Sequence, residues 1–276
     1  MRNMPKFSIV TISYNQAGFL EETILSILNQ GHPNVEYIVV DAGSTDGSRD
    51  LIKQYRNKIS TVILEPDRGP ADGLNKGFDE ATGDWLAFIN ADDALAVGAL
   101  YSIDRFLEDH PDVDIVLGAG HVVDSTGALI KPIRPMDFTM IKWLYGGADF
   151  IQQGMFFRRS TYEKTRRFNV DNRTCWDAEL LIDMLLAGAK LACHDDVLGL
   201  FRIHGESISG TGRLNAAYKI DTGRLFEKAM GRTRSPVDNI ISLYYRIAKW
   251  LSHPLYYAKR YVHENRRHHS NSATNS

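Results

Sequence analysis

The stretch FSIVTISYNQAGFLEETILSILNQGHPNVEYIVVD, residues 7–41, decides the fold class of this chain. It begins with a short apolar run (7–13), continues with apolar residues at helical spacing (19–30), and ends in a second apolar run (35–40). This order predicts a strand, a helix and a second strand, the unit from which parallel sheets are built. Because both strands are almost continuously apolar, we expect helices to cover both faces of the sheet.

The same alternation continues to about residue 120. Helical patterns at 48–58, 71–81 and 95–109 alternate with apolar runs at 61–65, 85–90 and 114–120. The sequence therefore predicts an α/β fold with a mostly parallel, helix-flanked sheet. Beyond residue 120 the pattern predicts a hairpin around 125–127, a helix near 137–145, a strand over 151–158, a helix over 177–188 and two short strands within 190–202.

The composition excludes several classes of protein. A chain of 276 residues with 43% hydrophobic content can bury one large core, and its formal net charge of -2 gives no global attraction to nucleic acid. Cys175 and Cys193 have neither the C-x-x-C spacing of a metal site nor the density of a secreted disulfide scaffold, which indicates reduced thiols. No run is long and apolar enough to span a bilayer, and the first strand lacks the features of a signal peptide, so we expect a cytoplasmic protein.

Polar residues follow four of the predicted strands at their carboxyl ends, where ligands bind in open parallel sheets. These ends read Ser13-Tyr14-Asn15, Asp41 to Gly47, Glu65 to Gly69, and Asn90-Ala91-Asp92-Asp93. In the last of them two adjacent carboxylates end a buried strand. Asp93 could cap the helix that follows. Asp92 suits a hard divalent cation, which takes one or two carboxylates and fills its other positions with water and phosphate oxygens.

Four motifs resemble those of the family-2 inverting glycosyltransferases with the nucleotide-diphosphosugar transferase (GT-A) fold. They are SIVTISYNQAGFLEETILSILNQ (8–30), EYIVVDAGSTDGS (36–48), DRGPADGLNKGFDEATGDWLAFINADD (67–93) and FRIHGES (201–207). The resemblance is specific over residues 8–93, looser over 94–208, and does not extend beyond about 215. It implies a Rossmann-like catalytic domain over 1–215, with a nucleotide-sugar-binding half (1–93) and an acceptor half (94–215).

The resemblance also implies roles for single residues at the donor side. Asp41 would accept the N3 proton of uracil while Tyr14 packs on the base, which favours a UDP-sugar, although thymine offers the same edge. Arg68 would contact the base or phosphate, and Asp72 and Asn75 would face the ribose and sugar. The remaining residues expected to bind the nucleotide sugar are Thr11, Ser44, Asn90, Ala91 and Asp92.

Asp92 matches the last residue of the aspartate-x-aspartate motif of the family, whose carboxylate binds a divalent metal (Mg²⁺ or Mn²⁺) on the diphosphate. Asn90 occupies the first position of the motif here, which leaves Asp92 as the main ligand. His204 is expected to contact the diphosphate or metal, with a structural histidine as the alternative, and Arg202 and Ser207 are weaker candidates. A divalent ion also suits this position on physical grounds, because it offsets the charge that develops on a departing diphosphate.

An inverting transfer needs a base that takes the proton from the attacking hydroxyl. Asp177, at the start of a predicted helix, matches the position of the family's catalytic carboxylate, and an N-cap is its other possible role. Glu179 lies two residues on, about 200° around a helix, so only one of the two can face the cleft. Gln153 and Trp176 are also expected on the acceptor side, where Trp176 either stacks on a sugar or belongs to the core.

These features predict an inverting, metal-dependent hexosyl- or N-acetylhexosaminyltransferase that acts on a saccharide or lipid-linked acceptor in cell-surface polysaccharide synthesis. The alternatives are a non-catalytic sugar-nucleotide-binding module and a sugar-1-phosphate nucleotidyltransferase. The second alternative would need a glycine-rich, arginine-containing phosphate loop after the first strand, where this chain has Tyr14-Asn15-Gln16-Ala17-Gly18. The sequence does not predict the oligomeric state.

A helical tail over 216–276 is predicted to follow the catalytic domain. From about residue 240 it combines aromatic residues (Trp250, Tyr256, Tyr257, Tyr261) with cations (Arg246, Lys249, Lys259, Arg260, Arg266, Arg267). This pattern is typical of a helix lying on the cytoplasmic face of an anionic membrane. A helix packed on the domain is the alternative. Pro254 is expected to divide the tail into two helices, because proline interrupts helical hydrogen bonding.

Overall fold

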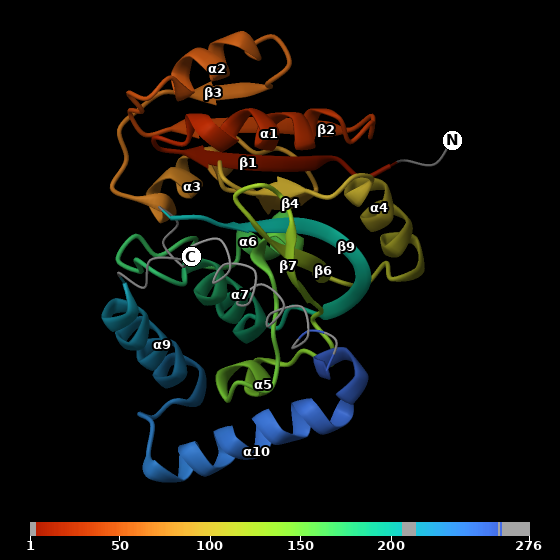
Figure 1. The fold of residues 1–276 in the computed structure, drawn as a ribbon, viewed down its shortest axis with the longest axis vertical. Helices are drawn as coiled ribbons and strands as arrows, with labels where there is room; N and C mark the ends of the chain where they lie inside the picture. The colour runs from red at the N-terminus through yellow and green to blue at the C-terminus, as the bar shows by residue number, and fades with distance from the viewer. Residues whose placement is uncertain (1–3, 206–213, 259, 261–276) are drawn as a thin grey trace, which may run out of the picture.

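The computed structural model describes residues 4–205, 214–258 and 260. One sheet runs through the molecule in the order β3-β2-β1-β4-β8-β6-β9-β5, with β7 paired to β6 (Figure 1). Its strands are β1 (Phe7–Ser13), β2 (Val35–Asp41), β3 (Thr61–Ile63), β4 (Trp85–Phe88), β5 (Ala94–Leu95), β6 (Ile115–Asp124), β7 (Leu129–Ile133), β8 (Met155–Arg158) and β9 (Leu191–Ile203). The helices are α1 (Ala17–Leu28), α2 (Ser48–Gln54), α3 (Pro70–Asp79), α4 (Ala99–Asp109), α5 (Met140–Leu144), the 3-10 helix η1 (Gln152–Gly154), α6 (Arg159–Tyr162), α7 (Trp176–Leu186), α9 (Asn215–Met230) and α10 (Pro236–Ser252).

The first half of the sheet is parallel. β1 pairs with β2 and β4, and β2 pairs with β3, all in parallel, so their carboxyl ends meet at one edge. Beyond β4 the sheet is mixed, because β8 pairs antiparallel with both β4 and β6. The helix-flanked α/β sheet expected from the sequence is confirmed, and the parallel half brings the four polar strand ends to one edge.

Two apolar layers hold the helices on opposite faces of the sheet. On one face α1, α2 and α4 pack through residues such as Ile24, Ile52 and Ile103. On the other face α3, α6 and α7 pack through residues such as Leu74, Tyr162 and Leu181. This arrangement explains why the strands read as apolar runs rather than as alternating patterns, since side chains on both faces are covered.

The second half of the chain departs from the predicted elements in two places. Residues 151–158 do not form one strand, because the chain first makes η1 and enters the sheet only with β8. The two short strands predicted within 190–202 are instead one strand, β9. Its pairing with β6 jumps from His194 to Val197 and again from Val197 to Gly199. Such bulges keep a strand paired across an interrupted apolar pattern.

The helices α9 and α10 pack on the rest of the molecule. Leu225 and Phe226 of α9 share an apolar cluster with α5 and α7, and Ile241 and Tyr245 of α10 pack against it. α10 ends at Ser252 and the chain is helical again over 254–258, so the predicted division at Pro254 is confirmed. Within the described part of the chain, no helix has the length and apolarity to cross a membrane.

Candidate active site

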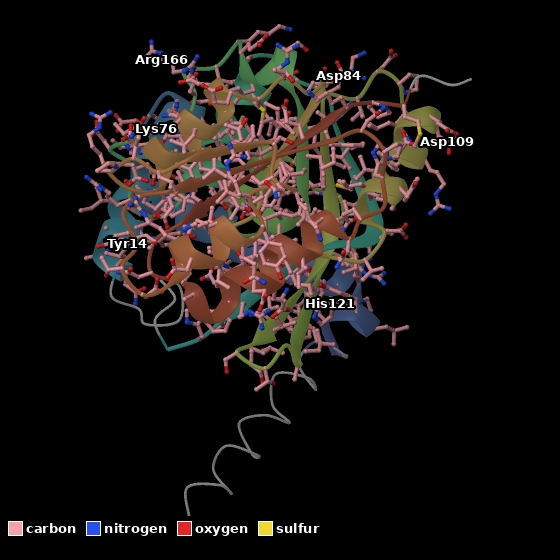
Figure 2. All side chains as sticks on the ribbon, turned by 90° about the horizontal axis from the view of Figure 1, so that it is seen from above. Tyr14, Lys76, Asp84, Asp109, His121 and Arg166 are labelled. Carbon is pink, nitrogen blue, oxygen red and sulfur yellow. The ribbon has the colours of Figure 1, made fainter. Side chains whose placement is uncertain are left out.

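Two loops at the carboxyl ends of β1 and β2 are locked together by hydrogen bonds. The Asn15 amide donates to Ser44 Oγ (2.8 Å), and the Thr45 amide donates to Asn15 Oδ1 (2.9 Å). The Ala17 amide, at the start of α1, donates to the Asp46 carboxylate (2.8 Å). The Ser44 hydroxyl therefore connects the two loops. Tyr14 remains 62% exposed at the edge of the molecule, well apart from Asp84 at the amino end of β4 (Figure 2).

Asp41 is completely buried at the end of β2. Its Oδ1 accepts hydrogen bonds from Arg49 Nε (2.7 Å) and from the amides of Gly43 (3.1 Å) and Ser44 (3.0 Å). Burial alone would raise the pKa of Asp41, but hydrogen bonds from Arg49 and Ser44 outweigh burial and hold it below its ordinary value. Among the described residues only Ser44 Oγ donates to Oδ2 (2.5 Å), which leaves a lone pair for an N–H donor.

Arg49 was not among the residues predicted from the sequence. The sequence feature that could have identified Arg49 is its position, as a cation in the first turn of the helix that follows the Asp41 loop. The Arg49–Asp41 ion pair keeps the carboxylate charged at the carboxyl end of β2. Sequence spacing does not reveal which of the nearby cations makes such a contact.

The loop after β3 brings an ion pair to the same edge. Arg68 Nη2 lies 3.2 Å from Asp72 Oδ1, and the Arg68 amide donates to Asp72 Oδ2 (3.0 Å). Burial of the neighbouring Asp67, followed by the charge of Asp72, raises the pKa of Asp67, although the Gly69 amide opposes this. Asp67, which the sequence analysis included in a polar strand end without giving it a role, is thus a further carboxyl group at this edge.

Two residues predicted to bind the nucleotide sugar have hydrogen-bond partners within the protein. Thr11 is fully buried within β1, where its Oγ1 accepts a hydrogen bond from the Tyr37 hydroxyl (3.1 Å). Asn75 bonds the backbone of Phe168 through both ends of its amide, donating to the carbonyl (2.9 Å) and accepting from the N–H (3.0 Å). Because these groups already have partners, the structure places Thr11 in the core and Asn75 in the contact between α3 and the segment before α7.

Asp92 and His204 meet at the end of β4. Asp92 Oδ2 lies 3.1 Å from His204 Nε2, and the two side chains are 19% and 6% exposed. The His204 ring also packs on Phe19 of α1, with the ring centroids 4.6 Å apart. A histidine near the end of β9 and a carboxylate after β4 are therefore brought together from segments more than a hundred residues apart in the chain.

Two oxygens beside this pair are buried without a hydrogen-bond partner in the described residues. They are Asn90 Oδ1, two residues before Asp92, and Ser13 Oγ at the end of β1. A buried polar atom without a partner is destabilising, and native proteins usually satisfy such atoms. Both atoms lie at the carboxyl ends of adjacent strands, which is where a polar ligand would satisfy them.

The helix-cap interpretation of Asp93 is wrong. The next helix, α4, begins at Ala99 with Gly98 as its N-cap, and Asp93 is buried in the site. Its carboxylate accepts hydrogen bonds from Gln153 Nε2 (2.6 Å), Asn90 Nδ2 (3.1 Å) and the Arg202 amide (2.8 Å). Burial, together with the charge of Asp92, raises the pKa of Asp93 well above its ordinary value. Gln153 thus holds the Asp93 carboxylate in place next to Asp92.

Arg202 holds the Asp92–His204 pair in place through contacts with the Asp92 backbone and with α1. It is 2% exposed, its Nε donates to the Asp92 carbonyl (2.9 Å), and its Nη2 lies 2.6 Å from the Glu22 carboxylate. Its guanidinium also stacks over the Phe19 ring, 5.2 Å from the centroid. These contacts connect β9, α1 and the Asp92 loop. Ser207 lies outside the described residues.

Asp177 lies in the first turn of α7, but Cys175 is the N-cap, so the capping role predicted for Asp177 is not seen. The Asp177 side chain is partly buried, and no side chain among the described residues forms a hydrogen bond or an ion pair with it. Burial raises the pKa of Asp177 to about 6, against the opposing effect of the backbone N–H groups at the helix terminus. A carboxylate with this pKa is charged at neutral pH yet more basic than an ordinary aspartate.

The segment before α7 is tied by hydrogen bonds to the loop after β3 and to α3. Arg173 Nη1 donates to the Arg68 carbonyl (2.8 Å), and the Asn75 contacts described above hold Phe168. Trp176, the first residue of α7, packs against the apolar cluster on this face of the sheet while remaining partly exposed. The amino end of α7, with Asp177, therefore projects from a segment anchored beside the loop that carries Arg68.

Glu179 faces a different neighbour. It is 3% exposed and accepts hydrogen bonds from Arg224 Nη1 (2.9 Å) and Nη2 (2.7 Å), from Lys228 (3.2 Å) and from Asn172 (2.8 Å). Burial would raise the pKa of Glu179, but the Arg224 and asparagine hydrogen bonds outweigh it and hold it below the ordinary value. Glu179 thus joins α7 to α9, whereas Asp177 has no such partner among the residues that the structure describes.

Replacing Glu179 by glutamine is expected to destabilise the fold by about 2–4 kcal/mol, because it removes the buried negative charge that Arg224 and Lys228 share, although each keeps a second carboxylate, Asp221 and Asp183. Urea denaturation at pH 7.5 measures this. Glu163→Gln, which removes an exposed i,i+4 pair with Arg159, is the matched control and should change stability by less than about 0.5 kcal/mol. An equal effect of the two substitutions would contradict the structural role of Glu179.

Comparison with known proteins identifies a family and relatives that this chain resembles. The family model described as Glycosyl transferase family 2 matches residues 8–166. The chain is 42% identical over 92 residues to the putative teichuronic acid biosynthesis glycosyltransferase TuaG of Bacillus subtilis, covering 32% of this chain and 36% of that protein. It is 29% identical over 214 residues to the uncharacterized glycosyltransferase alr2836 of Nostoc sp., covering 72% of this chain and 65% of the relative. The chain thus spans less than two thirds of either relative.

Solved structures show the same fold. S. aureus TarS 1-349 in complex with UDP-GlcNAc aligns with a TM-score of 0.69 at 18% identity, covering 90% of this chain and 73% of that one. The mannosyltransferase PcManGT from Pyrobaculum calidifontis, in complex with GDP-Man and Mn2+, aligns with a TM-score of 0.63 at 20% identity, covering 92% and 76%. These likenesses support the GT-A architecture. Since the family model matches more than half of its residues, the chain belongs to glycosyl transferase family 2.

Proposed function

We propose that this chain transfers a sugar, with inversion, from a nucleotide-diphosphate sugar to a hydroxyl of a saccharide or lipid-linked saccharide acceptor. The observation that carries the proposal is the Asp92–His204 pair, which lies beside two buried oxygens without partners in the described residues. A UDP-sugar is the donor that fits best, because Asp41 keeps a lone pair for the N3–H of uracil beside the exposed Tyr14 ring. The names of relatives, teichuronic acid and PGL/p-HBAD biosynthesis glycosyltransferases, support a role in building cell-surface saccharides.

A divalent metal, Mg²⁺ or Mn²⁺, fits the residues present. Asp92 offers a carboxylate, His204 lies 3.1 Å from it, and the buried Asn90 Oδ1 has no partner among the described residues. Such ions accept few protein ligands and share the rest with phosphate oxygens. Among the described residues no cluster of three or more His, Cys, Asp or Glu side chains could hold a metal. When bound, the ion would offset the charge of the departing diphosphate.

Asp177 acts as the base in this proposal. Its carboxylate takes the proton from the acceptor hydroxyl, whose oxygen forms the new bond to the anomeric carbon as the bond to the diphosphate breaks. Arg202 and Gln153 keep the acidic loop in place during this step through their contacts with Asp92 and Asp93. Glu179 remains occupied by Arg224 and Lys228 and takes no part in the proton transfer.

A panel of nucleotide sugars with Mn²⁺ tests the donor assignment by thermal shift. A ligand that binds only the native state raises the apparent stability, so UDP-sugars should raise the melting temperature more than GDP- or ADP-sugars at equal concentration. Release of UDP in the presence of an acceptor saccharide then separates an enzyme from a non-catalytic binding module. Binding of UDP-sugars without turnover or donor hydrolysis would favour the module, and an equal shift with every base would contradict the role of Asp41.

The pH dependence of kcat/KM should report the ionisation of Asp177. Because burial raises its pKa to about 6, kcat/KM should rise about tenfold per pH unit below pH 6 and level off above it. Initial rates between pH 4.5 and pH 8 at saturating Mn²⁺ measure this profile. The Glu163→Gln control should keep the same inflection. A profile that is flat down to about pH 5 would rule out a base with this pKa.

A further inference from the structure

α10 carries an apolar stripe on the side that faces away from the protein. Its members recur at helical spacing and are about half to three quarters exposed, namely Ile240 (69%), Leu243 (59%), Tyr244 (66%), Ile247 (50%), Trp250 (49%) and Leu251 (74%). The opposite side of the helix packs on the protein through Ile241 and Tyr245. Figure 1 shows α10 as the outermost element, at the end of the molecule opposite α2 and β3. A helix that is apolar on its exposed side usually has a partner there.

After Asp238 the charged side chains of α10 are cations, and the exposed Asp137 pairs with His253 just beyond the helix (3.6 Å). Residues 239–258 contain no aspartate or glutamate. Asp238, at the start of α10, is buried and bound by Arg232 Nη2 (2.7 Å) and by the Tyr145 hydroxyl (2.7 Å). Arg246 is exposed at the border of the stripe and forms no ion pair with any described residue. The exposed side of α10 is therefore apolar with a cationic border.

Several tail residues predicted to face a membrane are used internally instead. Lys249 and Arg260 both bind Asp149, at 2.8 Å and 2.7 Å. The Tyr256 hydroxyl donates to the Pro132 carbonyl (3.1 Å), and Tyr257 is 7% exposed. Lys259, Tyr261, Arg266 and Arg267 lie outside the described residues. Within the described part of the tail, the exposed interaction surface is thus the apolar stripe of α10 with Arg246 at its border.

We propose that the α10 stripe docks this protein on the surface of an anionic phospholipid bilayer, with the helix lying flat in the interface. The stripe would insert its aliphatic side chains among the acyl chains, and Trp250 and Tyr244 suit the headgroup level, where amphipathic rings collect. Arg246 would meet lipid phosphates. The 17-residue helix, about 26 Å long at 1.5 Å per residue, offers an extended apolar edge for such contact.

A second copy of the chain fits this surface less well. In a symmetric helix pair the same face meets itself, so the Arg246 side chains would approach a surface that has no acidic residue from 239 to 258. A bilayer with anionic headgroups supplies the missing negative charge. The proposal does not depend on the chemistry of the Asp92–His204 site, because α10 contributes no residue to the site described above.

Vesicle co-sedimentation of the full chain tests the proposal. The intact protein should bind vesicles of three parts phosphatidylcholine to one part phosphatidylglycerol. The triple variant Leu243→Ser, Ile247→Ser, Leu251→Ser should bind at least about tenfold more weakly, because it removes apolar area that would insert into the bilayer. A matched control replaces exposed apolar residues elsewhere, Val97→Ser, Leu186→Ser and Ile220→Ser, and should bind like the intact protein.

The same preparations should be analysed by light scattering and thermal denaturation. An unchanged melting temperature of the stripe variant shows that its weaker binding is not caused by unfolding, since all three positions are exposed. Absence of vesicle binding by the intact protein, or equal binding by the stripe and control variants, would overturn the proposal. A dimer of the intact chain that the stripe variant converts to a monomer, without vesicle binding, would assign the face to a second copy and would also overturn it.

Discussion

Asp177→Asn is expected to lower turnover by a factor on the order of 10²–10⁴, the range in which a general base contributes. The substitution removes the group that is proposed to take the proton from the acceptor. It leaves intact the residues at the carboxyl ends of β1, β2 and β4, which are proposed to bind the donor. Donor affinity, measured by calorimetry with a UDP-sugar and Mn²⁺, should change little. Asp171→Asn, which changes an exposed aspartate in the segment before α7, is the matched control and should retain activity.

The same variant should be more stable than the wild type above pH 6. Burial raises the pKa of Asp177 to about 6 in the folded protein, from an ordinary value near 3.8, so the folded state holds this proton more tightly than the unfolded state. The contribution of Asp177 to the free energy of unfolding is therefore fully present below about pH 4 and is lost as the pH rises through 6, by up to about 3 kcal/mol. Asparagine avoids this loss because it does not ionise.

Urea denaturation of both proteins at pH 5 and pH 8 measures the difference. A gain in stability combined with a loss of turnover is typical of a strained functional group, whereas a packing residue would lose both. If donor affinity collapsed together with turnover, Asp177 would belong to the donor site instead of acting as the base. Equal stability of the two proteins at pH 8 would contradict the effect of burial on its pKa.

Asp92→Asn should reduce metal-dependent turnover by a factor on the order of 10²–10³, the loss expected when a group that stabilises developing charge is removed. The fold should persist, since the Asp92 side chain contacts His204 (3.1 Å) and asparagine has nearly the same shape as aspartate. The rise in melting temperature produced by Mn²⁺ together with a UDP-sugar should be lost in the variant. EDTA should abolish the same rise in the wild type.

Glu65→Gln provides the matched control for Asp92, because Glu65 is an exposed carboxylate just beyond β3 at the same edge of the sheet. It should keep both activity and the Mn²⁺-dependent thermal shift. Undiminished activity of Asp92→Asn at low Mn²⁺ would remove Asp92 from the site. A loss of activity with an unchanged Mn²⁺ shift would place the metal on other groups and leave Asp92 with a role in orienting the donor.

Local patterns in the sequence determined the first half of the fold and the position of the site. Apolar periodicity depends only on neighbouring residues, so β1, β2 and β4 could be read from it, and the carboxyl ends of parallel strands necessarily share an edge. This places Tyr14, Asp41 and Asp92 at one edge without any knowledge of long-range contacts. Their roles in binding the donor stay predictions that the variants above test.

Only the tertiary structure decided which polar groups have partners within the protein. Asp93 is buried, and Gln153 and Arg202 donate hydrogen bonds to it from distant segments. Glu179 is bound by Arg224 of α9. In the described part of the tail, Lys249 and Arg260 bind Asp149, and the apolar stripe of α10 is exposed. The pattern of one segment cannot show these pairings, because a buried polar group is satisfied by whichever partner the fold brings within about 3 Å of it, and that partner is set by the packing of the whole chain.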